Sequence, residues 1–174
     1  MRVIGIDFSL TNTGIVCIED GKVTKYLAIS TSKSVGSNIT LTTDCYFRVT
    51  KIVDKLLHEF TLPPNVLVIE SPSFHSVGNA SVTIPMANGM LVSRLLNYWK
   101  NSEFISVTPS QLKKYATGKG NANKEGMLNA MKNRNTSLHE AVSKIPKTKG
   151  RYDICDAYFL ADFGYNHIDK QKFE

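Results

Sequence analysis

Short apolar runs separated by turn sequences open the chain. Residues 3–6 form a mostly apolar run that ends at Asp7, the turn sequence LTNTG follows at residues 10–14, and residues 15–18 are apolar again. Runs of this length on either side of a turn predict a β-hairpin. Residues 22–30 alternate between apolar and polar after an Asp-Gly turn, which predicts a third antiparallel strand.

The apolar spacing becomes that of a helix beyond a polar loop. Residues 31–43 are rich in Ser, Thr, Gly and Asn and predict a loop, in which Thr42 or Thr43 could cap the next element. The apolar residues of 46–60 recur at helical spacing, which predicts an amphipathic helix with one face on the core. The all-apolar run VLVI at residues 66–69 is typical of a strand covered on both faces.

Helical and extended patterns alternate in the second half of the chain. The stretch from Ala80 to Lys100 is apolar at helical spacing, and Pro85 fits best in the first turn, so that the residues before the proline can belong to the loop. Its apolar positions exceed what one buried face requires, which favours contact with a partner chain. The pattern is completed by a strand at residues 104–107 and helices at residues 109–115, 124–131, 138–141 and 152–164. Five strands with intervening helices predict an α/β fold.

Carboxylates end two of the predicted strands. Asp7 ends the first strand, and Glu70 ends the run VLVI. An unpaired carboxylate buried at such a place costs several kcal/mol, so it needs a cation, a basic partner or a cleft open to water. Each residue also has a plainer interpretation, since Asp7 can cap its own turn and acidic residues at strand ends are frequent.

The last predicted helix adds two more carboxylates. Asp153 and Asp156 are three residues apart on an otherwise apolar helix, so they lie side by side and repel each other unless a cation lies between them. A solvated acidic face is the alternative. Asp162 falls six residues after Asp156 and is expected at the surface. Together with Asp7 and Glu70, the pair makes four hard oxygen donors without Cys or His, a set that selects Mg²⁺ or Mn²⁺.

Positive charge is concentrated in one segment. The formal net charge is +6, and residues 100–151 contain eleven Lys and Arg against three acidic residues, which leaves −2 for the rest of the chain. A basic segment on a near-neutral body is typical of a polyanion-binding protein, although a solvated basic face has the same composition. Two metal ions beside such a segment would clamp the attacking and leaving oxygens of a phosphodiester.

Two further stretches are candidates for nucleic-acid contact. Residues 71–79, SPSFHSVGN, are expected to form a loop whose Phe74 could stack on a base or pack into the core, while a lone His75 is more often a surface residue. Residues 117–126, TGKGNANKEG, lack the order of a Walker A loop but can hold backbone phosphates.

Length and cysteine content limit the remaining possibilities. A chain of 174 residues fits one domain spanning residues 1–174. Three scattered cysteines predict buried thiols in a reducing compartment, and argue against a disulfide framework or a zinc ribbon. No stretch resembles a membrane span or a signal peptide, so we expect a cytoplasmic protein with no membrane contact.

Four motifs, in order, resemble those of the RuvC family of Holliday junction resolvases. They are GIDFSLTNTG, VIES, TPSQLKKYATGKGNANKEGM and DICDA, and the resemblance covers about residues 2–164. It suggests a phage-type member, which would act in the host cytoplasm. The family implies a ribonuclease-H-like fold, with a mixed five-stranded sheet whose first three strands are antiparallel and which is flanked by helices. It also implies a homodimeric, Mg²⁺-dependent crossover junction endodeoxyribonuclease that makes paired, symmetrical nicks in four-way DNA junctions.

The resemblance also implies roles for individual residues. Lys113 and Lys124 match basic residues near the scissile phosphate, with Lys124 expected among the catalytic residues, and Phe74 lies near an aromatic residue at the junction centre. The lysines expected to contact DNA are Lys113, Lys114, Lys119 and Lys124. The helix from Ala80 to Lys100 corresponds to the dimer contact. The sequence Ser-Pro-Ser after Glu70, which precedes Phe74, departs from the common cellular pattern of the family. The residues that match the family's ligands for two metal ions are Asp7, expected to touch both ions, Glu70, Asp153 and Asp156.

Three other functions are compatible with parts of the sequence. A ribonuclease of the same fold could act on RNA–DNA hybrids, and a protein with the same four acids could bind junctions without cutting them. The hairpin GIDFSLTNTG also resembles the first phosphate motif of the superfamily of actin, sugar kinases and heat-shock ATPases. That superfamily needs two such domains and a second glycine-rich turn, for which 174 residues leave no room.

Overall fold

A mixed five-stranded sheet forms the centre of the computed structural model, which describes residues 1–33, 40–72 and 80–168. The strand order is β3-β2-β1-β4-β5. Strands β1, β2 and β3 pair antiparallel, whereas β4 and β5 run parallel to β1. This arrangement confirms the predicted sheet. The strands are β1 (Arg2–Asp7), β2 (Asn12–Glu19), β3 (Lys22–Ser30), β4 (Val66–Glu70) and β5 (Glu103–Val107).

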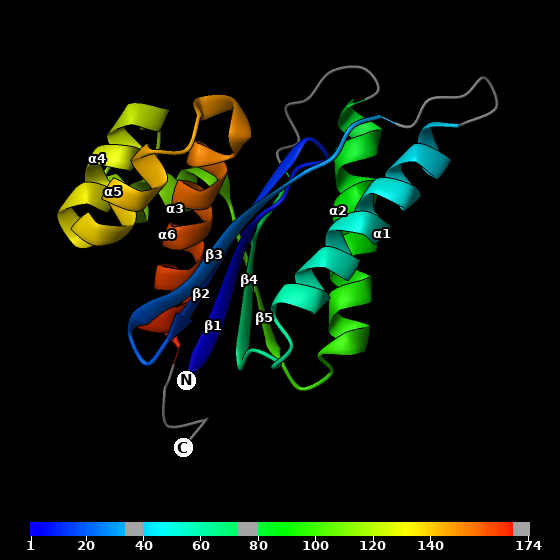
Figure 1. Ribbon diagram of the computed structural model, residues 1–174, viewed down its shortest axis with the longest axis horizontal. Coiled ribbons are helices and arrows are strands. Elements are labelled where there is room, and N and C mark those ends of the chain that lie inside the picture. Colours follow the sequence, from blue (N-terminus) through cyan, green and yellow to red (C-terminus); the bar gives the residue numbers. More distant parts are fainter. Residues whose placement is uncertain (34–39, 73–79, 169–174) are drawn as a thin grey trace.

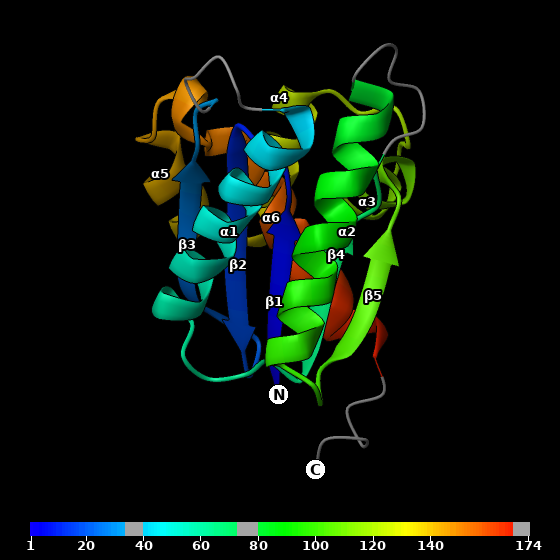
Figure 2. The same ribbon diagram turned by 90° about the vertical axis from the view of Figure 1, so that its right-hand side faces the viewer.

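Helices cover both faces of this sheet (Figure 1). One face carries α1 (Leu41–Glu59) and α2 (Ala80–Tyr98), which run side by side over the sheet, roughly along its strands (Figure 2). The opposite face carries α3 (Pro109–Thr117), α4 (Lys124–Arg134), α5 (Thr136–Ser143) and α6 (Arg151–His167), and a 3-10 turn, Lys147–Lys149, precedes α6. None of the helices in the described part of the chain combines the length and apolar content needed to cross a membrane.

Two apolar clusters fill the spaces between the sheet and its helices. One contains Ile4, Ile52 and Leu91 with their neighbours from α1 and α2, and the other contains Val3 and Phe159 with their neighbours from α3 to α6. Neighbouring positions of a strand point to opposite faces, which is why β1 contributes to both clusters. The three cysteines are buried and free, as predicted.

Two helix starts differ from the predictions. Helix α1 begins at Leu41, and its cap is Thr40, whose hydroxyl accepts a hydrogen bond from the backbone N–H of Thr43 at 3.2 Å, so the predicted caps Thr42 and Thr43 lie inside the first turn. Helix α2 begins at Ala80, which places Pro85 inside the helix and not in its first turn. The helix continues through the proline because its buried residues further along, such as Leu91, anchor it to the sheet.

Candidate active site

Alternation along β1 and β4 brings Asp7 and Glu70 to the same face of the sheet. In β1, Val3 packs in the cluster beneath α6, whereas Ile4 packs beneath α1 and α2. Strand β4 alternates in the same way, with Val68 beneath α6. Because side chains two positions apart share a face, Asp7 and Glu70 also lie on the α6 face. The parallel register of the two strands sets the carboxylates at adjacent strand ends, as the sequence predicted.

Two glycines allow α6 to lie directly on the sheet. A Cβ atom added at Gly5 would overlap the backbone of Ala157, and one added at Gly14 would overlap the carbonyl group of Asp153. Gly14 pairs with Asp7 across the β1–β2 hairpin. The first turns of α6, which carry the other two predicted carboxylates, therefore lie against the end of β1.

Three of the four predicted carboxylates and two lysines line one cavity of about 340 Å³. Strands β1 and β4 contribute Asp7 and Glu70, and α6 contributes Asp156. Helices α3 and α4 contribute Lys113 and Lys124. Five residues that are far apart in the sequence thus meet at one place. The rest of the lining is Pro109, Leu112, Ala122, Asn123 and Met127.

Burial and mutual repulsion dominate the electrostatics of these carboxylates. Burial raises the pKa of Asp7 well above its usual range, and the nearby charges of Asp156, Glu70 and Asp153 raise it further, in that order. The ammonium group of Lys124 opposes this rise. Asp153 does not line the cavity, but its effect on the pKa of Asp7 shows that it belongs to the same charge cluster.

Burial and neighbouring lysines also have opposite effects on the pKa values of the other carboxylates. Burial raises the pKa of Glu70 to about 7, against the opposing charge of Lys113. Burial, followed by Glu70 and Asp153, raises the pKa of Asp156 to about 7. Burial also raises the pKa of Asp153, and the nearby Lys124 lowers it. A group of buried acids that repel one another holds its charges only when a cation balances them.

This donor set suits a divalent cation. Its donor atoms are carboxylate oxygens only, the type that Mg²⁺ and Mn²⁺ prefer, and they belong to β1, β4 and α6, with three of the four acids lining the cavity. In the side-chain positions of the structure, no three His, Cys, Asp or Glu residues of the described ranges are arranged closely enough to hold one ion together. The chemistry of the donors and their repulsion therefore support metal binding, and the side-chain geometry alone does not.

Local sequence signals place the two lysines. Helix α3 begins with a capping box, in which the hydroxyl of Thr108 accepts a bond from the N–H of Gln111 and the side chain of Gln111 accepts one from the N–H of Thr108. Helix α4 is capped by Asn123, whose side chain accepts from the N–H of Gly126 at 2.9 Å. Lys124 is therefore the first residue of α4 and faces the cavity.

A buried arginine that the sequence analysis missed holds the turn after Asp7. Arg48 of α1 donates to the carbonyl of Leu10 at 2.6 Å and to the hydroxyl of Thr31 at 3.0 Å, and it pairs with Asp44 at 3.2 Å. The hydroxyl of Thr31 also donates to the carbonyl of Leu10. The contacts fix the β1–β2 turn relative to α1. The one local signal for the role of Arg48 is that Asp44 and Arg48 lie four residues apart on the apolar face of a helix.

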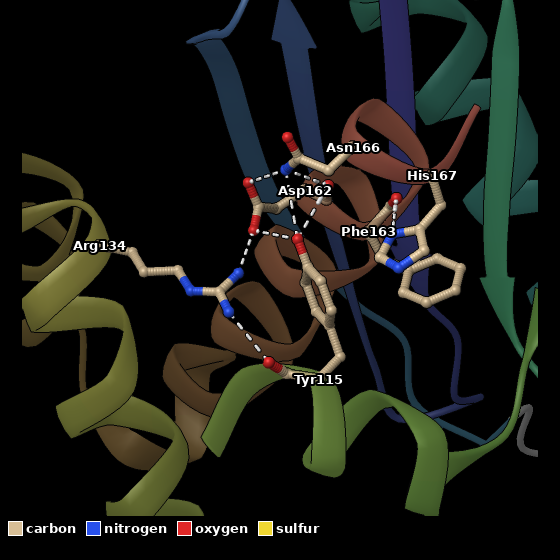
Figure 3. Close-up of polar contacts among 6 residues, drawn as sticks. All are labelled: Tyr115, Arg134, Asp162, Phe163, Asn166 and His167. Atoms are coloured by element: carbon tan, nitrogen blue, oxygen red, sulfur yellow. Dashed lines mark hydrogen bonds and ion pairs between the residues drawn. The ribbon is translucent and has the colours of Figure 1, made fainter. Parts of the chain in front are cut away.

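Asp162 is not a surface residue, contrary to the prediction. Its side chain is 17% exposed and accepts hydrogen bonds from Arg134 at 2.5 Å and from the hydroxyl of Tyr115 at 2.8 Å (Figure 3). Arg134 also donates to the carbonyl of Tyr115 at 2.9 Å, and the side chain of Asn166 donates to Asp162 at 3.0 Å. The network joins α3, α4 and α6, the three helices that supply the lysines and two of the acids.

The remaining predicted residues lie elsewhere. Lys114 and Lys119 are exposed and do not line the cavity. Phe74 and His75 fall outside the described residues. Their predicted roles stay predictions.

Comparison with solved structures identifies the fold. Thermus thermophilus RuvC has a TM-score of 0.62 to this chain at 20% identity, over 92% of this chain and 91% of that chain. For T. thermophilus RuvC in complex with Holliday junction substrate the TM-score is 0.64 at 19% identity, over 92% and 90%. For the yeast mitochondrial Holliday junction resolvase Ydc2 it is 0.62 at 15% identity, over 91% and 75%. The fold is therefore the ribonuclease-H-like fold of these proteins.

The family follows from the sequence. A family model described as crossover junction endodeoxyribonuclease RuvC matches residues 3–161. The chain therefore belongs to the RuvC family, which confirms the predicted family, fold and enzyme class. Members of this family depend on divalent metal ions. A search of curated proteins returns no match.

Proposed function

We propose that this chain resolves four-way DNA junctions by hydrolysing one phosphodiester bond in each of two strands, with two Mg²⁺ ions per active site. The supporting observation is the cavity that unites Asp7, Glu70, Asp156, Lys113 and Lys124. Acids alone would repel a DNA backbone, whereas acids beside lysines can bind both a metal ion and a phosphate.

The four carboxylates Asp7, Glu70, Asp153 and Asp156 are the proposed ligands. When bound, divalent ions would activate the attacking water and stabilise the leaving oxygen. Asp7 is the central ligand in this proposal, since its pKa responds to all three other acids. The rigid positions of β1, β4 and α6 keep the ligands in place, which limits the reorganisation needed when DNA enters.

Lys113 and Lys124 bind the phosphate in this proposal. Their charges act on the same carboxylates that would bind metal, because Lys113 lowers the pKa of Glu70 and Lys124 lowers the pKa of Asp7. A phosphate held by these ammonium groups lies beside the acids. The exposed Lys114 and Lys119 extend the positive surface along the DNA backbone, so binding should weaken steeply with salt.

We also propose a homodimer formed through α2. Val82 and Tyr98 are exposed on this helix, at opposite ends of it. A groove lined by Leu57, Arg94 and Tyr98 runs between α1 and α2. An isologous dimer has two active sites related by a two-fold axis, which matches the two symmetrical nicks that a four-way junction requires.

A gel assay tests the function. Purified protein is incubated with a synthetic four-way junction, a linear duplex and an RNA–DNA hybrid, with Mg²⁺ or with EDTA, beside the variant Asp7→Asn. We expect paired nicks in the junction by wild-type protein with Mg²⁺ only. Cleavage of the hybrid alone would assign a ribonuclease function, and binding of the junction without cleavage would assign a non-catalytic binding function; either result contradicts the proposal.

A further inference from the structure

The aromatic ring of Tyr152 lies beside Lys124, one of the two cavity lysines. Tyr152 is in the first turn of α6 and directly precedes Asp153. The Nζ atom of Lys124 lies over its ring, 4.9 Å from the ring centroid. An ammonium group over the face of an aromatic ring at this distance is attracted by the ring quadrupole.

The other end of Tyr152 is held by an ion pair. Its hydroxyl donates to Glu125 Oε1 at 2.7 Å, and the same carboxylate oxygen accepts from Lys147 Nζ at 3.0 Å. Lys147 Nζ also lies 5.8 Å from the ring centroid. The first two residues of α4 thus contact two parts of one tyrosine: Lys124 contacts the face of the ring and Glu125 contacts its hydroxyl group.

These contacts matter because a lysine side chain can adopt many rotamers. Lys124 is exposed, and a lysine with four rotatable bonds loses much conformational entropy when its end is fixed. The Tyr152 ring contacts its ammonium group, whose charge also acts on Asp7, Asp153 and Asp156. Glu125 and Lys147 are both 60% exposed, so their ion pair adds little to stability, and the contact of Glu125 with the ring system is the hydrogen bond from the Tyr152 hydroxyl.

We propose that Tyr152 is a positioning residue that holds the ammonium group of Lys124 toward the cavity and its phosphate. The inference rests on the proposed function, because it concerns the rate at which a junction is cut. It assigns no contact between Tyr152 and DNA. A tyrosine that only packs between α6 and α4 would stabilise the fold without acting through Lys124, and this is the alternative to be excluded.

A double-mutant cycle tests the proposal. Single-turnover cleavage of a four-way junction is measured with Mg²⁺ and saturating protein for wild type, Tyr152→Leu, Lys124→Ala and the double variant. We expect Tyr152→Leu to slow cleavage about two- to fivefold, the range set by an exposed cation–π contact. In the Lys124→Ala background the same change should have no further effect, because the group that it positions is gone.

Two further variants separate positioning from packing. Tyr152→Phe keeps the ring and removes the hydroxyl, so it should retain more of the rate than Tyr152→Leu. Tyr165→Leu makes the same substitution at another half-buried tyrosine of α6, whose ring packs near Gly21, and should leave the cleavage rate unchanged. Thermal melting of each variant shows that the assay temperature lies below its unfolding transition.

The outcomes are distinct. If Tyr152→Leu slows cleavage by the same factor with and without Lys124, or if Tyr165→Leu slows it equally, the positioning role is overturned. If wild type cuts the junction and Lys124→Ala cuts as fast, Lys124 has no role for Tyr152 to support, and the inference fails while the proposed function stands. If wild type cuts no junction, the proposed function itself fails.

Discussion

The two faces of the sheet differ in the surfaces that their helices present. Most of the exposed large hydrophobic side chains of the described residues lie on α1 and α2, namely Leu41, Tyr46, Phe47, Val82, Ile84 and Tyr98. In the described helices α3 to α6 no large hydrophobic side chain is exposed, and this side of the sheet carries the cavity and the basic segment. The sheet therefore separates a surface with several exposed apolar side chains from a surface whose described helices expose none.

This difference suggests a division of roles between the faces. Apolar side chains on the outside of packed helices are typical of protein–protein contacts, whereas lysines beside a cavity are typical of phosphate contacts. The proposed dimer, formed through α2, would leave the α6 face of each subunit open to DNA. If the division is correct, substitutions on one face should change oligomeric state and substitutions on the other should change catalysis.

The largest effect is expected from Asp7→Asn on the charged face. Removing the central ligand should reduce junction cleavage about a thousandfold or more, because a bound ion supplies several kcal/mol of transition-state stabilisation. Junction binding without metal should persist. Single-turnover cleavage and a gel-shift titration measure the two properties. Asp20→Asn is the control, since Asp20 is exposed at the opposite end of the sheet and Asn tolerates its positive φ.

The largest effect on the free energy of unfolding is expected from Asp156→Asn. The pKa of Asp156 is about 7 in the folded protein and about 4 in an unfolded chain, so the metal-free wild type loses stability as pH rises between these values. Asp156→Asn removes this loss. The variant should gain up to about 4 kcal/mol over wild type at pH 8 and little at pH 4.

Urea denaturation in EDTA at the two pH values measures the gain. Asp54→Asn, at a position with 63% side-chain exposure, serves as control. An equal gain at both pH values would contradict a raised pKa at Asp156.

A smaller effect, on association, is expected on the apolar face. Val82→Glu places a charge in the proposed dimer contact and should weaken dimerisation about a hundredfold. The subunits should fold normally, since Val82 is 63% exposed. Sedimentation across a concentration series measures the dimer dissociation constant. Leu62→Glu, at a position with 59% exposure outside the helices, is the control and should leave the dissociation constant unchanged. Equal sedimentation of both variants would show that α2 is not the dimer contact.

The sequence predicted the parts of the fold that depend on local pattern. All five strands follow from apolar runs and alternation, and the placement of Asp7 and Glu70 at strand ends follows from where those runs stop. The close contact of α6 with the sheet could not be read from the sequence, because the roles of Gly5 and Gly14 depend on which backbone lies above them.

Side-chain partners distant in sequence account for the wrong prediction at Asp162. Its hydrogen-bond donors Arg134 and Tyr115 are 28 and 47 residues away, so no local spacing indicates them. Tyr152 and Lys124 are also far apart in the sequence, so no local spacing indicates their contact. Patterns along the chain specify which face a residue occupies, and the packing of helices decides which side chain it meets.

The last prediction compares two arginines, one on each face. Arg134 and Arg94 are both 36% exposed, but Arg134 pairs with the half-buried Asp162, whereas Arg94 pairs with the exposed Asp54 at 3.4 Å. Removing a partner from a half-buried carboxylate leaves it poorly solvated, so Arg134→Ala should cost about 2 kcal/mol of unfolding free energy. Arg94→Ala should cost less than about 1 kcal/mol, because water replaces the lost partner.

Urea denaturation of both variants measures this difference, with Asp162→Asn added to restore an uncharged partner in the Arg134→Ala background. The double variant should recover part of the loss, since the unpaired charge is gone while the amide can still accept from Tyr115. Equal losses for Arg134→Ala and Arg94→Ala would mean that the network in Figure 3 contributes no more than a surface ion pair. In that case apolar packing alone would hold α3 and α4 on α6, and the two faces would differ in surface chemistry but not in how their helices are held.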